Sequence, residues 1–188
     1  YLLKTRNKVM DRQLVARIQN NDQQAMKLLY QRYVGILMSV CHRYVPSEDD
    51  VKDVLQNSFV KIFTSLHSFK FHKDDSLKAY MIKVVVNESL NFLRSQRKLQ
   101  FVGYEMLIEE PSDEEVDIES ISIDELHRLI RELPDGYRTV LNLYVFEELS
   151  HRQIAELLHI KESTSSSQLY YAKQWLAKKI KGLNTKKL

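Results

Sequence analysis

Small hydroxyl and aromatic side chains gather on one predicted helix near the carboxyl end of the chain. The segment "STSSSQLYYAK", residues 163–173, follows an amphipathic segment, residues 150–158, after the short break "HIKES", residues 159–163. Two helices joined so tightly are typical of a helix-turn-helix, whose second helix lies in the DNA major groove. Hydroxyls can bond phosphates or base edges, and tyrosine rings can contact thymine methyl groups. The residue types therefore favour DNA binding, with an ordinary helical hairpin as the alternative.

A second cluster of aromatic and basic residues lies in the polar segment "HSFKFHKDDS", residues 67–76, here called the aromatic loop. Two phenylalanines, Phe69 and Phe71, alternate there with Lys70, and Lys73 follows. Either ring could instead fill the core of a domain, because large apolar side chains are most often buried. The pattern predicts an aromatic, basic loop attached to a helical domain.

Helical periodicity flanks the aromatic loop on both sides. Apolar residues recur every three or four positions over residues 25–44, 51–66 and 77–98, and Pro46 ends the first of these segments. We therefore predict three helices that form one compact domain over residues 10–98.

Capping residues support the predicted helix starts. Asn21 with Gln24 fits a capping box for the first helix, and Ser47 can cap the second. The last residues of the third helix are basic, which suits the negative end of the helix dipole. The buried stripe of the second helix is predicted to consist of Val51, Val54, Leu55, Ser58, Phe59, Ile62 and Leu66.

The charge pattern divides the chain into three parts. Residues 1–100 carry 17 Lys and Arg against nine Asp and Glu, whereas residues 99–123 contain eight acids and no base. The acids repel one another, so we predict an acidic, extended linker whose apolar flanks could dock on a neighbouring domain. Helical periodicity returns over residues 124–184, with a break at "PDG", residues 134–136. We therefore predict an all-α protein of two small helical domains.

Composition narrows the class of protein further. Only four Gly and three Pro occur in 188 residues, which favours helices over turn-rich sheets. One cysteine, Cys41, allows no internal disulfide, and no apolar run reaches the roughly 20 residues of a membrane span. We expect a reduced, cytoplasmic protein without membrane insertion, and Met10 is a candidate start that leaves residues 1–9 as upstream sequence.

The sequence gives little support for an enzyme. Cys41 falls within an apolar stripe, the six His residues show no metal-binding spacing, and no Gly-rich phosphate loop is present. We therefore expect no catalytic residue, no metal and no cofactor.

Three motifs, in this order around an acidic linker, resemble the extracytoplasmic-function (ECF) sigma factors of bacterial RNA polymerase. "DVLQNSFVKIF", residues 53–63, resembles the Asp-x-x-Gln-x-x-Phe helix of that family. "LKAYMIKVVVNESLNFLRSQRK", residues 77–98, resembles its helix around an Asn with a basic end. "LPDGYRTVLNLYVFEELSHRQIAELLHIKEST", residues 133–164, resembles its Leu-Pro and Leu-Ser-x-x-x-Ile-Ala motifs. The resemblance extends from about residue 14 to residue 181.

The resemblance implies a protein that binds core RNA polymerase, carries it to promoter DNA and helps to open the duplex. It also implies an anti-sigma factor as a further partner. For the polymerase contact it implies Asp53, Gln56, Asn57 and Lys61, although a polar helix face in water has the same composition. For the unwound minus-ten element it implies Phe69, Lys70, Phe71, His72, Lys73, Lys83, Asn87, Arg94 and Arg97. For the minus-thirty-five element it implies Arg152, Ser166, Ser167, Gln168, Tyr170, Tyr171 and Lys173.

Several residues depart from the family pattern. Tyr80 stands where Trp is common, Asn57 replaces a frequent acid, and His159 replaces the turn glycine. The predicted recognition helix has few Lys and Arg, and fewer neutralised phosphates mean weaker DNA binding by this domain alone. The rival hypothesis is a helix-turn-helix regulator that acts without polymerase, which leaves the first domain and the linker without a role.

Overall fold

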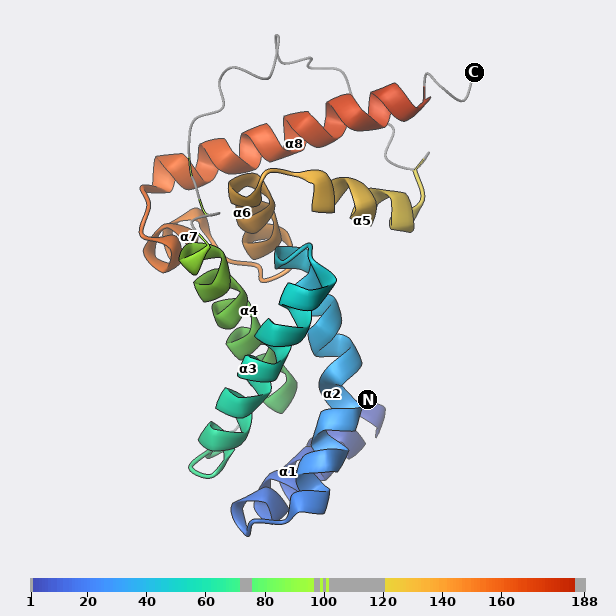
Figure 1. The fold of residues 1–188 in the computed structure, drawn as a ribbon, viewed down its shortest axis with the longest axis vertical. Coiled ribbons are helices and arrows are strands. Elements are labelled where there is room, and N and C mark those ends of the chain that lie inside the picture. The colour runs from blue at the N-terminus through green and yellow to red at the C-terminus, as the bar shows by residue number, and fades with distance from the viewer. Residues whose placement is uncertain (1, 72–75, 97–98, 100, 102–120, 185–188) are drawn as a thin grey trace. The chain divides into compact units, whose positions relative to one another are not determined.

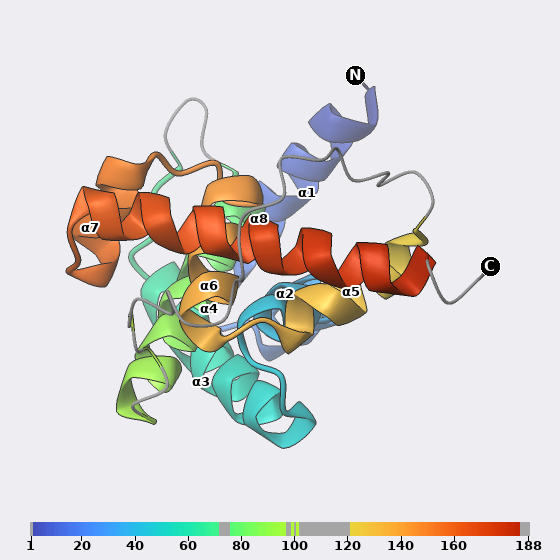
Figure 2. The same ribbon diagram turned by 90° about the horizontal axis from the view of Figure 1, so that it is seen from above.

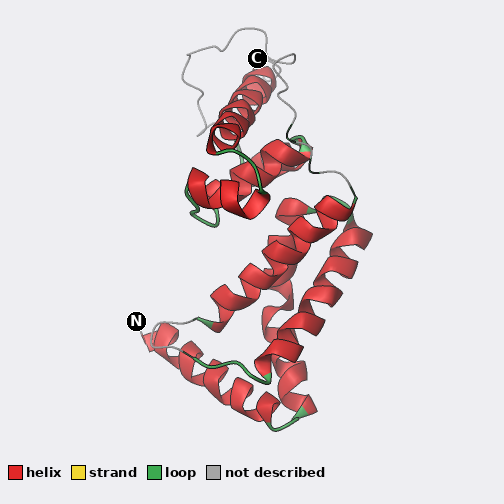
Figure 3. Cartoon of the chain, turned by 90° about the vertical axis from the view of Figure 1, so that its left-hand side faces the viewer, coloured by secondary structure: helices red, strands yellow, loops and turns green. Residues whose placement is uncertain are grey.

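The computed structural model describes residues 2–71, 76–96, 99, 101 and 121–184, which form eight α-helices and no strand (Figure 1). Figure 3 shows the described residues as helices and loops, with no strand among them. The chain divides into two compact units, residues 1–95 and 96–188. The all-α prediction is confirmed for the described residues.

The first unit contains four helices. They are α1 (Leu2–Gln19), α2 (Gln23–Tyr44), α3 (Glu48–Leu66) and α4 (Leu77–Ser95). Helices α2, α3 and α4 pack against one another, and α1 packs against α2 and α3. The aromatic loop joins α3 to α4.

Helix α1 was not predicted, although three of its apolar residues recur at helical spacing. Its inner face buries Leu14, Val15 and Ile18. The buried Asp11 accepts a 2.7 Å hydrogen bond from the hydroxyl of Tyr33 on α2. This polar contact and the three apolar residues hold α1 against its neighbour.

The caps of α2 and α3 test two of the predictions. Ser47 is the N-cap of α3, as predicted, and accepts from the backbone N–H of Asp50. The predicted capping box of Asn21 with Gln24 is wrong, because Asp22 is the N-cap of α2. Asn21 instead takes a left-handed conformation, with φ of 60°, in the turn between α1 and α2.

The predicted buried stripe of α3 is confirmed, since the seven residues proposed for it are all buried. The apolar pattern of α2 misleads at two positions, because Leu28 is 47% exposed and Ile36 is 40% exposed. Both flank the buried line through Leu29, Tyr33 and Leu37, so helical rotation turns them away from the neighbouring helices.

The second unit also contains four helices. They are α5 (Ile123–Glu132), α6 (Asp135–Val145), α7 (His151–Leu158) and α8 (Glu162–Asn184). Helix α8 packs against α6 and α7, and it contacts α5 nearer its carboxyl end (Figure 2). Ser122 caps α5, so the end of the predicted linker is already helical, while residues 102–120 of that linker lie outside the described residues.

Two sets of local interactions fix the connections between helices in the second unit. Arg138 is buried and donates to the carbonyl oxygens of Arg131 and Leu133 at 3.1 and 2.8 Å, and it is ion-paired with Asp135. These bonds fasten the end of α5 to the start of α6. A capping box of Ser150 with Gln153 is present at the start of α7.

The turn between α7 and α8 is shorter than predicted. Helix α7 ends at Leu158 and α8 begins at Glu162, so residues 159–161 form the break. His159 is the C-cap of α7 and has a φ of 57°, in the left-handed region where glycine costs least. His159, which stands where the family has a turn glycine, therefore adopts the left-handed conformation that glycine adopts most easily.

Candidate nucleic-acid interface

The described part of the aromatic loop forms a chain of ring contacts. The ring of Phe69 lies 4.9 Å from that of Tyr80 on α4 and 5.0 Å from that of Phe71, measured between centroids. The guanidinium of Arg12 on α1 lies 5.4 Å from the centroid of Phe71. Both phenylalanines are half-buried, so they neither fill the core completely nor project freely. Lys70 between them is exposed, while His72 and Lys73 lie outside the described residues.

Backbone carbonyls at the start of this loop are held by α1. The side-chain amide of Gln19 donates to the carbonyl oxygens of Leu66 and Phe69, at 3.1 and 2.9 Å. On the other side of the loop, the hydroxyls of Tyr80 and Ser65 are hydrogen-bonded to each other. Tyr80 stands where the family commonly has Trp. Its ring contacts Phe69, and its hydroxyl forms a hydrogen bond with Ser65 of α3.

Three predicted residues of the minus-ten set lie on α4. Lys83 and Arg94 are exposed and Asn87 is half-buried. Their spacing of four and seven residues puts them on one side of the helix. The guanidinium of Arg94 donates to the side-chain oxygen of Asn91 at 3.1 Å. Arg97 lies outside the described residues.

The polar side chains predicted for polymerase binding lie on the exposed face of α3. Asp53, Gln56 and Asn57 are exposed. Lys61 is also exposed, but its ammonium group lies 2.6 Å from the carboxylate of Glu88 on α4, which ties the two helices together.

Sequence reasoning missed one residue of this face, Val60. Its side chain is 61% exposed, and it lies one helical turn after Gln56. The sequence signal that could have identified it is an apolar residue outside the predicted buried stripe of α3. Asp53, Gln56, Asn57 and Val60 are together called the α3 face.

The helix-turn-helix carries an exposed line along the amino-terminal half of α8. Ser166, Tyr170 and Lys173 are exposed and spaced by four and three residues, so they share one side of the helix. We call these three residues the recognition face. Arg152 on α7 is also exposed and forms a 3.2 Å ion pair with Glu156.

Three other predicted residues of α8 are less available. Gln168 is only 2% exposed, so its side chain is not available in this structure for the DNA contact that the resemblance implies. It lies next to Leu169 and in the same buried register. Ser167 is half-buried and its hydroxyl donates to the carbonyl oxygen of Thr164 at 3.0 Å. Tyr171 is half-buried and stacks on Tyr137 of α6, with ring centroids 6.0 Å apart.

A joint that sequence reasoning did not find connects α6, α7 and α8. The Nδ1 atom of His151 lies 2.9 Å from the hydroxyl of the fully buried Ser165, and its ring stacks on Tyr144 at 4.9 Å. Ser165 belongs to the buried register that continues through Leu169 and Ala172. That register was the available signal, because it separates Ser165 from the exposed serine beside it.

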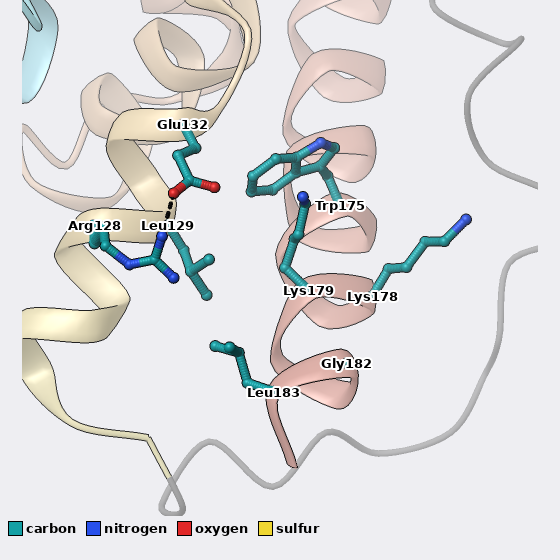
Figure 4. Close-up of a pocket in the computed structure, with 8 residues that line it drawn as sticks. All are labelled: Arg128, Leu129, Glu132, Trp175, Lys178, Lys179, Gly182 and Leu183. Carbon is teal, nitrogen blue, oxygen red and sulfur yellow. Dashed lines mark hydrogen bonds and ion pairs between the residues drawn. The ribbon is translucent and has the colours of Figure 1, made fainter. Parts of the chain in front are cut away.

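A cavity of about 550 Å³ lies between α5 and the carboxyl-terminal half of α8 (Figure 4). Leu129, Trp175 and Leu183 give it apolar walls. Charged groups line the rest of it: Arg128 is paired with Glu132, and the ammonium of Lys179 lies 5.0 Å from the centre of the Trp175 ring. The cavity is on the part of α8 that follows the recognition face.

The described residues offer little for catalysis. Cys41 is buried, and burial raises the pKa of its thiol to about 11, so the thiol stays protonated near neutral pH and is a poor nucleophile. Within the described ranges, His, Cys, Asp and Glu side chains form no cluster of three suited to a metal ion. None of the described helices is long and apolar enough to cross a membrane.

Comparisons with known proteins match both units. The family description "Sigma-70 region 2" matches residues 29–99, and "Sigma-70, region 4" matches residues 123–176. The first match contains the α3 face and the aromatic loop, and the second contains the helix-turn-helix. The fold and these surfaces therefore define a protein of the sigma-70 class.

Relatives that match over most of the chain define the type of sigma factor more closely. The chain is 30% identical over 185 residues to the ECF RNA polymerase sigma-E factor of Salmonella typhimurium LT2, covering 92% of this chain and 95% of that protein. It is 29% identical to the proteins of the same name from Haemophilus influenzae and Escherichia coli K12, covering 92% of this chain and 96% and 95% of theirs. The chain belongs to the ECF sigma factors, which bind core RNA polymerase and direct it to promoters.

Two solved structures share the fold. CnrH, in complex with the cytosolic domain of CnrY, gives a TM-score of 0.50 at 20% identity and covers 92% of this chain and 98% of its own. The sigma factor RpoE of Bartonella quintana, in complex with the anti-sigma factor NepR, gives a TM-score of 0.50 at 18% identity. That match covers 82% of this chain and 96% of RpoE.

Proposed function

We propose that this sigma factor divides its work between its two units. The first unit binds core polymerase through the α3 face and captures the unwound minus-ten strand with the aromatic loop and α4. The second unit reads the duplex minus-thirty-five element with the recognition face. The observation that carries the proposal is that each region matched to the family presents its own exposed surface of nucleic-acid-binding chemistry.

The α3 face has the composition of a small protein interface. Val60 supplies an exposed apolar centre, and Asp53 and Gln56 supply directional hydrogen-bonding groups around it. Such a carboxylate and amide can hold a partner's arginine, while the apolar centre excludes water. Lys61 serves this face indirectly, because Glu88 already holds its ammonium group.

The aromatic loop and α4 supply the two requirements of single-strand binding. The half-buried rings of Phe69 and Phe71 can stack on unpaired bases, which is worth about 1–3 kcal/mol per base. The exposed ammonium and guanidinium groups of Lys70, Lys83 and Arg94 attract the phosphate backbone. Asn87 shares one side of α4 with Lys83 and Arg94 and provides hydrogen bonds for a base edge.

The recognition face carries one cation, Lys173, beside the hydroxyls of Ser166 and Tyr170. Few phosphate contacts mean weak binding by the second unit alone. We therefore propose that polymerase holds this unit on the DNA, and that the unit contributes sequence preference more than affinity.

Regulation and location follow from the same proposal. Two proteins of this fold were solved in complex with another protein, one of which is described as an anti-sigma factor, and we propose an anti-sigma factor for this chain too. The protein would act in the bacterial cytoplasm, where polymerase and promoter DNA are present. It would act by binding, without a cofactor and without a catalytic activity of its own.

The decisive experiment is reconstitution with bacterial core polymerase. The protein should co-elute with core enzyme, and the complex should transcribe from promoters that core enzyme alone ignores. Promoters can be selected from a random library with the reconstituted holoenzyme. Tight binding to duplex DNA together with indifference to core polymerase would instead support the polymerase-independent regulator.

The α3 face has its own test. Asp53→Ala with Gln56→Ala should weaken the affinity for core polymerase while leaving helicity unchanged, because both side chains lie off the buried stripe. Gln23→Ala with Gln24→Ala, two exposed positions at the start of α2, is the matched control. Equal affinities in a titration would refute the assignment.

A further inference from the structure

Helix α1 makes two contacts with the aromatic loop that the proposed function does not use. One is the pair of hydrogen bonds from the amide of Gln19, at the last residue of α1, to the carbonyl oxygens of Leu66 and Phe69. The other is the guanidinium of Arg12, which covers the ring of Phe71 at 5.4 Å. Both contacts come from a helix that lies outside the residues matched to the region 2 family description.

The hydrogen bonds of Gln19 go to carbonyl oxygens at and just after the end of α3. Helix α3 ends at Leu66, and the last carbonyls of a helix have no partner within it. The Leu66 oxygen accepts one bond from the Phe69 N–H at 3.2 Å and a second from Gln19 at 3.1 Å. The Phe69 oxygen, already in the loop, accepts the shorter bond of 2.9 Å. A single amide therefore bridges the helix end to the loop and fixes the direction in which the loop leaves α3.

The ring contacts continue the same constraint. Tyr80 supports Phe69 from α4, Phe69 contacts Phe71 edge to face, and Arg12 covers Phe71 from α1. The described part of the loop that contains Phe69 and Phe71 is thus held between α1 and α4, and these two rings have fixed positions before any strand arrives. A loop fixed in advance loses less conformational entropy when it binds.

We propose that Gln19 and Arg12 of α1 are positioning residues that hold the aromatic loop ready to capture the unwound strand. Gln19 sets the path of the loop backbone, and Arg12 sets the tilt of the Phe71 ring. This inference rests on the proposed role of the loop in binding single-stranded DNA. It gives α1 a function in strand capture, although α1 itself contributes no base contact.

The principal variant is Gln19→Leu, which keeps the size of the side chain and removes both donors. Its matched control is Gln13→Leu, the same change at an exposed position of the same helix. The measured quantity is the affinity of the reconstituted holoenzyme for a fluorescent single-stranded DNA carrying the minus-ten sequence selected by the wild-type protein. We expect binding about tenfold weaker for Gln19→Leu, since two neutral hydrogen bonds contribute on that order. Gln13→Leu should bind as the wild type does.

Arg12 is tested by two variants that separate stacking from charge. Arg12→Ala removes both, and Arg12→Lys keeps the positive charge but loses the planar group. Binding about threefold weaker is expected for Arg12→Ala, as an exposed cation–π contact is modest. Arg12→Lys should recover only part of that loss. Full recovery by Lys would mean that Arg12 attracts the strand by charge alone and does not position the ring.

A double-mutant cycle distinguishes positioning from general stability. In a Phe69→Ala, Phe71→Ala background the loop has no rings to position, so the added effect of Gln19→Leu should fall below about twofold. Affinity for core polymerase and the melting temperature should be equal for Gln19→Leu and Gln13→Leu. A Gln19→Leu effect that persists undiminished without the rings would overturn the inference.

The same experiment separates this inference from the proposed function. If the Phe69→Ala, Phe71→Ala protein binds the strand as well as the wild type does, the loop does not capture it and the proposed function fails. If that protein is impaired while Gln19→Leu is not, strand capture stands and the positioning role of α1 is wrong.

Discussion

The two units support their candidate DNA surfaces by different means. In the first unit the surface is a loop, held by the side chains of Gln19, Arg12 and Tyr80 from two helices. In the second unit it is one side of α8, held by the buried residues Leu169 and Ala172 on the opposite side. A helix face keeps its shape as long as the core behind it is packed, whereas a loop keeps its shape only through particular bonds.

This difference predicts two kinds of mutational effect. Changes to the loop supports should alter strand binding with little loss of stability, because those side chains lie near the surface. Changes to the supports of α8 should unfold the second unit, because they lie in its core. The predictions below run from the largest expected effect to the smallest.

The largest effect is expected at Arg138, the buried arginine that fastens α5 to α6. Burial disfavours the charged guanidinium and lowers its pKa, while the carboxylate of Asp135 acts in the opposite direction. Arg138→Met leaves that carboxylate and two carbonyl oxygens without their donor, at a cost of about 3 kcal/mol in the free energy of unfolding. Hydrogen exchange should quicken throughout α5–α8 and remain unchanged in α2–α4. Arg128→Met, at an exposed ion pair on α5, is the control and should change exchange little.

The recognition face should show a change in preference without a change in stability. Ser166→Ala with Tyr170→Ala should cost on the order of 1–3 kcal/mol of discrimination at one base pair of the upstream element. Lys173→Ala should instead weaken all sequences evenly and reduce the dependence on salt, as loss of a phosphate contact does. Both are measured in the holoenzyme across a library of upstream sequences.

Gln168 supplies the internal contrast for that measurement. Because its side chain is buried, Gln168→Leu should leave sequence preference unchanged. A preference altered by Gln168→Leu but not by the Ser166 and Tyr170 changes would contradict the assignment of the exposed side of α8.

The first unit should lose stability at alkaline pH. Burial raises the pKa of Cys41 to about 11 from an ordinary value of 9.0, so the folded state favours the protonated thiol. The stability that the protonated thiol contributes is complete below pH 9 and falls by about 2–3 kcal/mol as the pH rises from 9 to 11. Burial and the Asp11 hydrogen bond raise the pKa of Tyr33 to about 12 in the same direction.

Urea titrations between pH 8 and 11 measure this effect. Cys41→Ala should be less stable at pH 8 because it leaves a small cavity, but its stability should fall less steeply with pH. Parallel pH dependences for the variant and the wild type would show that this thiol is not the titrating group.

The smallest effects are expected from two substitutions, one in each unit, of which one introduces a glycine and the other removes one. His159→Gly should stabilise the second unit by about 1 kcal/mol, because a left-handed φ of 57° is strained for a side chain with a Cβ. Gly35→Ala should stabilise the first unit by about 0.5–1 kcal/mol, because the added methyl meets no atom within 4 Å and alanine favours the helix. Thermal unfolding followed by probes in each unit measures both. A loss of stability from either change would contradict the backbone conformation described for that position.

Much of the architecture could be predicted from the sequence, because it depends on local spacing. The buried stripe of α3, the N-cap at Ser47 and the capping box at Ser150 follow from residue types a few positions apart. The break between α7 and α8 and the order of the family motifs were also readable. Periodicity carries this information, since a helix face is fixed by 3.6 residues per turn.

Tertiary structure decided which polar and aromatic residues are available. Ser165, Ser166 and Ser167 are neighbours of one type, yet the first is buried against His151 and the second is exposed. The resemblance implies a DNA contact for Gln168, yet its side chain is buried, because the position of α6 and α7 around α8 determines which side of that helix is covered. The support of the aromatic loop by Gln19 joins residues 47 and 50 positions apart. Such a contact depends on how α1 packs against the other helices, and no local pattern in the sequence specifies it.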